Sequence, residues 1–133
     1  MLIFRQAFQL LWSAGKNSMD IQVNKEHYFN QKYNHRARWL SYWYQIDLVS
    51  GIEARDILEI GSGNGIVRDY LKKCGSNVKT LDIDPALSPD YAASIDDMQI
   101  NEKFSCVLAA EVLEHLPFEK FELCLLEIFK VSD

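Results

Sequence analysis

The sequence is poor in the features that mark secreted, membrane-spanning or nucleic-acid-coating chains. It has three prolines and three cysteines in 133 residues, and Cys74, Cys106 and Cys124 form neither a CxxC pair nor a secretory disulfide pattern. We therefore expect reduced, buried thiols in a cytoplasmic protein rather than a redox or metal site. Lysine and arginine form no sustained run, and the net charge is −5. This balance argues against non-specific attraction to nucleic acid or to an anionic membrane.

A long hydrophobic run is also missing. The most apolar stretch near the N-terminus, residues 2–12, is interrupted by Arg5, Gln6 and Gln9. It is too short and too polar to span a bilayer. It also lacks the longer apolar run and the small-residue cleavage site of a signal peptide. We expect an amphipathic helix there and no membrane as a partner.

The composition that remains is that of an ordinary globular chain, with 48% hydrophobic and 25% charged residues. Between Tyr33 and Val49, apolar residues recur at steps of three and four, which predicts a helix with one buried face, stopped by Gly51. The expected face consists of Trp39, Leu40, Tyr42, Trp43, Ile46 and Val49. An aromatic stripe at this spacing is more typical of a core than of a ligand site. We interpret His27, His35, Arg36 and Arg38 as solvated surface.

Downstream of this helix, short apolar runs alternate with helical spacing. Strands are predicted at residues 56–60, 78–83, 91–95 and 104–110. Helices are predicted at residues 66–74, 111–116 and 118–131, with Gly75 just past the first and with Phe121, Leu125, Ile128 and Phe129 buried by the last. Strands that alternate with helices at this spacing predict an α/β fold with a parallel sheet.

The most informative stretch is LEIGSGNG at residues 58–65, in which a strand runs into a glycine turn and then a helix. Glycines suit a backbone that turns with positive φ and approaches a ligand closer than a Cβ permits. Asp82 ends the next strand, where a carboxylate can accept hydrogen bonds from both hydroxyls of a ribose. The alternative for Asp82 is a helix cap or turn former. Asp84, which precedes a proline, is the stronger candidate for that role.

Spacing distinguishes two cofactor classes, because dinucleotide enzymes favour GxGxxG whereas this chain has GxGxG preceded by Glu59. Together with TLDIDP at residues 80–85 and FSCVLAAEVLEHLP at residues 104–117, the turn resembles class I, Rossmann-like, S-adenosylmethionine-dependent methyltransferases from about Tyr42 to Val131. The resemblance implies that S-adenosylmethionine is the cofactor. It implies a glycine turn of Gly61, Ser62, Gly63 and Gly65 beneath the methionine portion, supported by Glu59. It also implies Asp82 on the ribose and Ile83 along the adenine face.

Two further segments match positions of the family that contact the cofactor. Ser94 and Ile95 fall where the family places its adenine contacts, and the adenine amino group would be held by the Ser94 hydroxyl or by Asp96. Glu111 follows the fourth strand and would approach the methionine end or the substrate. Its alternative role is that of an acidic residue early in a helix, favoured by the helix dipole. Glu111, Glu114 and His115 also resemble part of a metal set in one RNA methyltransferase family, but we predict no metal. A general-base role for His115 stays a hypothesis.

The resemblance divides the chain into an N-terminal helical segment, residues 1–50, and a partial cofactor-binding domain, residues 51–133. Strands five to seven of the family's sheet do not occur in this sequence, so we expect the strand at residues 104–110 to be a sheet edge with unpaired backbone groups. Self-association through that edge is one expected consequence. The function predicted is methyl transfer to a small-molecule or other unidentified acceptor. The alternative is a truncated, non-catalytic remnant that binds cofactor or a protein partner.

Overall fold

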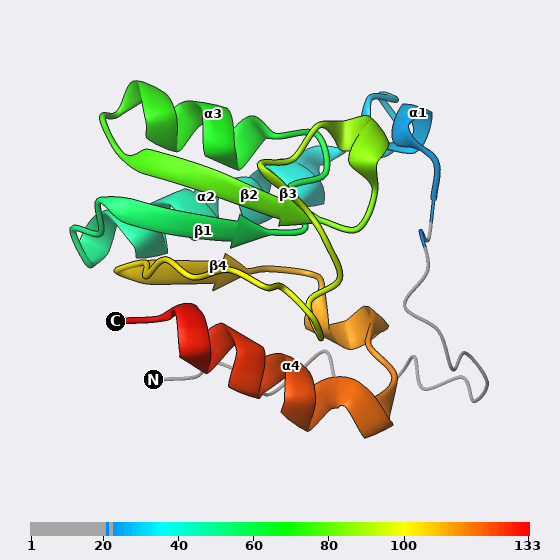
Figure 1. Ribbon diagram of the computed structural model, residues 1–133. Helices are drawn as coiled ribbons and strands as arrows, with labels where there is room; N and C mark the ends of the chain where they lie inside the picture. Colours follow the sequence, from blue (N-terminus) through cyan, green and yellow to red (C-terminus); the bar gives the residue numbers. More distant parts are fainter. Residues whose placement is uncertain (1–20, 22) are drawn as a thin grey trace.

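The fold is a parallel α/β sheet with helices on both faces, as the sequence predicts. The computed structural model describes residue 21 and residues 23–133, so the helix expected at residues 2–12 lies outside the described residues. The strands are β1 (Asp56–Ile60), β2 (Asn77–Asp82), β3 (Tyr91–Ala92) and β4 (Cys106–Ala109). All pairings are parallel, and the four strands lie in the order β3-β2-β1-β4. The arrangement is Rossmann-like (Figure 1).

Helices form a layer on each side of the sheet. They are α1 (Lys25–Tyr28), α2 (Arg36–Gly51), α3 (Ile66–Lys73) and α4 (Phe118–Val131), with 3₁₀ turns η1 (Pro85–Leu87) and η2 (Leu113–His115). Helices α2 and α3 cover one face, and α4 covers the other (Figure 1). Among the described residues, no helix combines the length and the apolar character that a bilayer crossing requires.

Alternation along the strands explains why two separate cores form. Ile57 packs with Tyr42, Val49 and Leu71 on the side of α2 and α3. The next residue, Leu58, packs with Cys124 and other residues on the side of α4. Successive side chains of a strand point to opposite faces, so the consecutive apolar residues Ile57 and Leu58 of β1 contribute to both cores. Helix α2 therefore shares its core with the sheet and with α3.

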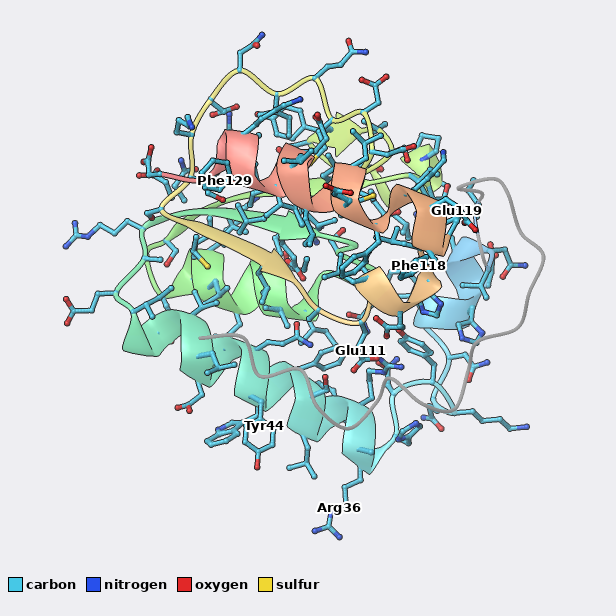
Figure 2. The ribbon with its side chains drawn as sticks, turned by 90° about the horizontal axis from the view of Figure 1, so that it is seen from below. Arg36, Tyr44, Glu111, Phe118, Glu119 and Phe129 are labelled. Carbon is cyan, nitrogen blue, oxygen red and sulfur yellow. The ribbon has the colours of Figure 1, made fainter. Side chains whose placement is uncertain are left out.

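Several sequence expectations about burial are wrong. On α2, Trp39, Leu40 and Trp43 are about half exposed, because only the side of the helix that carries Tyr42, Ile46 and Val49 meets the sheet. Figure 2 shows Tyr44 and Arg36 on the outer side of this helix. On α4, Leu125 is 40% exposed and Phe129 is 77% exposed, whereas Cys124 is fully buried. Both helices carry apolar residues around most of their circumference, so periodicity alone does not define the buried side.

Element ends also differ from expectation. Residues 111–116 form only the short η2 turn rather than a helix, and β3 is limited to two residues. Gly51 is the last residue of α2 and not a stop beyond it. Gly75, by contrast, follows α3 with φ +96°. The amide of Gly75 donates to Lys72 O and that of Ser76 to Leu71 O, both at 3.1 Å, the pattern of a Schellman cap.

The cysteines are all free thiols, but only one of them is buried. Cys124 lies in the α4 core, Cys106 is partly buried on β4, and Cys74 is exposed at the end of α3. Burial raises the pKa of Cys124 to about 11, which keeps this thiol protonated. The expectation of three buried thiols is therefore wrong for Cys74, which is the C-terminal cap residue of α3 and is exposed.

Strand β4 is the last strand on its side of the sheet within the described residues. Its N-terminal approach is covered, because Phe104 and Ser132 form a parallel bridge in which the Phe104 amide donates to Val131 O at 2.8 Å and the Asp133 amide donates to Phe104 O at 3.1 Å. Within the part of the chain that the structure describes, the strand itself, Cys106–Ala109, pairs with β1 alone. An apolar strand with one unpaired edge is a template for edge-to-edge association.

We propose that a second copy of this chain pairs with that edge, and we predict that the 133-residue chain self-associates. Light scattering over a range of protein concentrations should show a mass that rises above the monomer. The exposed apolar side of α4 offers a second route, and Phe129→Glu should then shift the equilibrium toward monomer without a loss of helical signal. A monomer at every concentration would contradict the prediction.

Candidate functional site

A cavity of about 370 Å³ opens at the carboxyl ends of the strands. Its walls come from the turn after β1, the end of β2, the segment after β3 and the residues after β4. The chain runs outward from β1 through β2 to β3 and then returns to place β4 on the other side of β1. Open α/β sheets bind ligands at such a reversal of strand order, and the volume is in the range of small-molecule sites.

The glycine turn needs its glycines for two separate reasons. Gly61 and Gly63 have φ values of +75° and +50°, in the left-handed region that side chains disfavour. Space is also limited, because a Cβ on Gly61 would lie 2.3 Å from Val112 Cγ2 and one on Gly63 would lie 3.2 Å from Tyr28 Cδ1. The turn after β1 is therefore packed against the segment after β4 on one side and against α1 on the other.

Gly65 has a different position from the other two glycines. It caps the N-terminus of α3 with φ +74°, and its amide donates to Ser62 O at 2.8 Å. A Cβ there would lie 2.2 Å from the guanidinium of Arg68. Gly65 is not among the residues that line the cavity. It shapes the turn, while Gly61, Ser62 and Gly63 form the cavity wall.

Asp82 lies at the end of β2 with 8% of its surface exposed and lines the cavity. Its Oδ1 accepts a hydrogen bond of 3.0 Å from the Asp84 amide. Burial raises the pKa of Asp82, although backbone amides, including that of Gly63, oppose the shift. The capping role considered for Asp84 is confirmed, because its Oδ1 accepts from the Ala86 amide at the start of η1. Ile83 lines the cavity between these two carboxylates.

Glu59 and Ser62 contribute buried polar atoms without partners. Glu59 is 6% exposed, and its Oε2 has no hydrogen bond. Burial raises the pKa of Glu59 to about 7, in spite of the opposing charge of Arg68. Ser62 Oγ is likewise buried and unpaired. Native structures leave few such atoms unsatisfied, so two of them on one cavity wall indicate a place for a polar ligand.

The segment after β3 brings Ser94 and Ile95 to the cavity, but not Asp96. The Ser94 hydroxyl donates to the Asp96 carboxylate, and Lys120 Nζ of α4 donates to the same carboxylate at 2.6 Å. Asp96 is thus committed to an ion pair that ties this segment to α4. Of the two groups considered for an adenine amino contact, only Ser94 lies on the cavity wall.

Glu111 lines the cavity from the segment after β4, with φ +55°. The helix-dipole explanation for this residue is wrong, because Glu111 precedes η2 and belongs to no helix. Its carboxylate forms an ion pair with Arg38 and accepts a hydrogen bond of 2.7 Å from Ser41 Oγ. Figure 2 shows Glu111 between α2 and the strand end. The carboxylate therefore links α2 to the segment after β4.

Sequence reasoning missed the contribution of α1, of the segment that joins α1 to α2, and of Arg38. Tyr28, Tyr33 and Arg38 line the cavity, and the rings of Tyr28 and Tyr33 meet edge to face at 5.4 Å. Asn64 of the glycine turn donates to Tyr42 Oη at 2.8 Å and to Asn34 Oδ1 at 2.9 Å. These bonds hold the helical segment over the turn. The solvated interpretation is therefore wrong for Arg38, which is 22% exposed in its side chain.

The described residues contain no group of three or more His, Cys, Asp or Glu side chains placed to hold a metal ion. Glu111 and His115 both line the cavity, whereas Glu114 does not. The η2 turn is too short to align the three residues on one helix face.

We predict that ionisation of Glu59 lowers the free energy of unfolding as the pH rises. Its folded pKa lies above the ordinary value, so the folded state retains a proton that the unfolded chain releases, and stability falls from about pH 4.5 to about pH 7. Over that interval Glu59→Gln should gain up to about 3 kcal/mol of unfolding free energy relative to the native chain. Denaturant unfolding at several pH values measures this, and parallel stability curves for the two proteins would contradict it.

Comparison with known proteins places the chain in a family. A search of curated proteins found no match. A family profile described as "Methyltransferase domain" matches residues 58–132, more than half of the chain, from the middle of β1 to just past the end of α4. The matched residues include most of the cavity wall. The chain belongs to this family of class I methyltransferase domains.

Proposed function

We propose that this chain is an S-adenosylmethionine-dependent methyltransferase and that the cavity at the strand ends binds the cofactor. The observation that carries the proposal is the convergence of the glycine turn, the buried carboxylate of Asp82 and the unpaired polar atoms of Glu59 and Ser62 on one cavity. Family membership supports it.

Each sequence-predicted residue receives a role that its position supports. Asp82 would accept hydrogen bonds from the ribose hydroxyls, because a carboxylate has about four acceptor positions and the backbone amides around it do not use all of them. Ile83, Ser94 and Ile95 would lie against the adenine. Gly61, Ser62 and Gly63 would lie beneath the methionine portion with Glu59 behind them, Gly65 would shape the turn, and Glu111 would approach the methionine end.

Charge favours this cofactor over a dinucleotide. Four carboxylates line the cavity, those of Glu59, Asp82, Asp84 and Glu111, against one guanidinium. A wall of that sign attracts a sulfonium and an ammonium group and repels a pyrophosphate. The buried position of Glu59 strengthens the preference, because a nearby cation favours the ionised form of that carboxyl.

The chemistry asks little of the protein beyond alignment. When bound, the cofactor would supply a methyl group on an already activated sulfonium, which an in-line displacement would transfer to the acceptor with S-adenosylhomocysteine as the leaving group. The chain's residues would orient the donor and exclude water, with Tyr28 and Tyr33 closing the side of α1. The acceptor would be a small molecule or another unidentified group. His115, which lines the cavity, could take a proton from it. The free cysteines support a cytoplasmic location.

Ligand preference tests the proposed cofactor. Isothermal calorimetry on the purified chain should show binding of S-adenosylmethionine or S-adenosylhomocysteine that is tighter than binding of NAD, because the acidic cavity disfavours a pyrophosphate. Tighter binding of NAD would show that the cavity belongs to another cofactor class.

Substitution of Asp82 tests its proposed contact with the ribose. Asp82→Ala should weaken binding of S-adenosylhomocysteine by about 1 to 3 kcal/mol, the scale of charge-assisted hydrogen bonds, without unfolding the chain. Asp56→Ala is the matched control, because Asp56 is exposed at the opposite end of the sheet. An affinity that Asp82→Ala leaves unchanged would move the ribose contact to another residue.

A further inference from the structure

Arg38 is the one lysine or arginine among the described residues that line the cavity. It comes from α2, outside the segment that matches the family, so the family motifs do not account for it. A solitary guanidinium among four carboxylates is an unusual feature in a wall of otherwise acidic character. It requires a separate explanation.

The guanidinium is held in place but not fully satisfied. One terminal nitrogen pairs with the Glu111 carboxylate, and the group lies over the Tyr33 ring with its carbon 4.6 Å from the ring centre. Nε of Arg38 is buried and has no hydrogen-bond partner. A buried donor without an acceptor costs free energy, and more so on a charged group. The ring of Tyr33 supports the guanidinium, and the unpaired Nε shows that the group has unused donor capacity.

A second unsatisfied donor lies on the same cavity. The Ser62 hydroxyl is buried without a partner on the glycine turn. A guanidinium and a hydroxyl are both donors that suit a carboxylate, and a planar guanidinium suits it best because its nitrogens match the two oxygens. The Glu111 carboxylate, which accepts hydrogen bonds from Arg38 and Ser41, suits a cationic group.

We propose that Arg38 binds the α-carboxylate of an amino-acid group in the cavity and that Glu111 binds the ammonium of the same group. Without ligand, Arg38 and Glu111 pair with each other. When the zwitterionic group binds, this ion pair separates, and each side chain pairs with the opposite charge of the ligand. The inference rests on the proposed function, since the methionine portion of the cofactor is the amino-acid group. It adds an anion-binding residue from α2 to the site.

The experiment measures the contribution of the ligand's α-carboxylate to binding. Affinities of S-adenosylhomocysteine and of its decarboxylated analogue, S-adenosyl-3-thiopropylamine, are measured by calorimetry on the native chain and on Arg38→Gln. The native chain should prefer S-adenosylhomocysteine by about ten- to a hundredfold, the range for a hydrogen-bonded charge pair. Arg38→Gln should remove that preference by weakening S-adenosylhomocysteine alone. Arg36→Gln, on the outer side of the same helix, is the matched control and should keep the preference.

Each outcome has a distinct meaning. Equal weakening of both ligands by Arg38→Gln would show that Arg38 only supports the fold of the site, and no change for either would show that it does not touch the ligand. Either result overturns the inference. Equal affinities on the native chain would also overturn it while leaving the proposed function intact, whereas failure to bind both ligands would reject the proposed function itself. If Arg38→Gln does not fold, Arg38→Met, which keeps an apolar side chain of similar length and removes the charge, replaces it, and a preference equal to that of the native chain overturns the inference.

Discussion

The turn that follows β1 is the constraint on which the rest of the structure depends. Its backbone passes through positive φ at Gly61 and Gly63, and side chains from two different segments pack onto it. Val112 fills the space where a Cβ on Gly61 would lie, and Tyr28 does the same for Gly63. The turn thereby fixes the distance between β1, the segment after β4 and α1.

The site is built at a cost in stability. Glu59 and Asp82 are buried carboxyl groups with raised pKa values, and Glu59 keeps an oxygen without a partner. Neither arrangement favours the fold without a ligand, since burial of an unpaired polar group is unfavourable. Residues that violate the ordinary rules of burial concentrate where a protein binds or reacts. The unpaired atoms of Ser62 and Arg38 belong to the same pattern, which extends from the glycine turn to α2.

The sequence predicted the strands, the glycine turn and the position of Asp82. Short apolar runs indicate buried strands, and glycines indicate a turn with positive φ. It failed for α2 and α4, whose apolar residues surround the helix, so that periodicity did not show which side meets the sheet. It failed also for Arg38, which is distant in sequence from Glu111 and meets it only through the packing of α2 on β4. The Asn64 bonds to Tyr42 and Asn34 are of the same kind. An asparagine between two glycines was visible in the sequence as a candidate for such hydrogen bonds. The residues that it bonds could not be identified from the sequence.

The central claim is that the cavity at the strand ends is the cofactor site. Titration of the isotopically labelled chain with S-adenosylhomocysteine, followed by amide NMR, tests it most directly. The account predicts that the largest shift changes occur at Gly61 to Gly63, Asp82 to Asp84, Ser94 and Ile95, with Glu111 affected as well. Shift changes confined to the open edge of β4 or to the outer side of α2, with the glycine turn unperturbed, would contradict it.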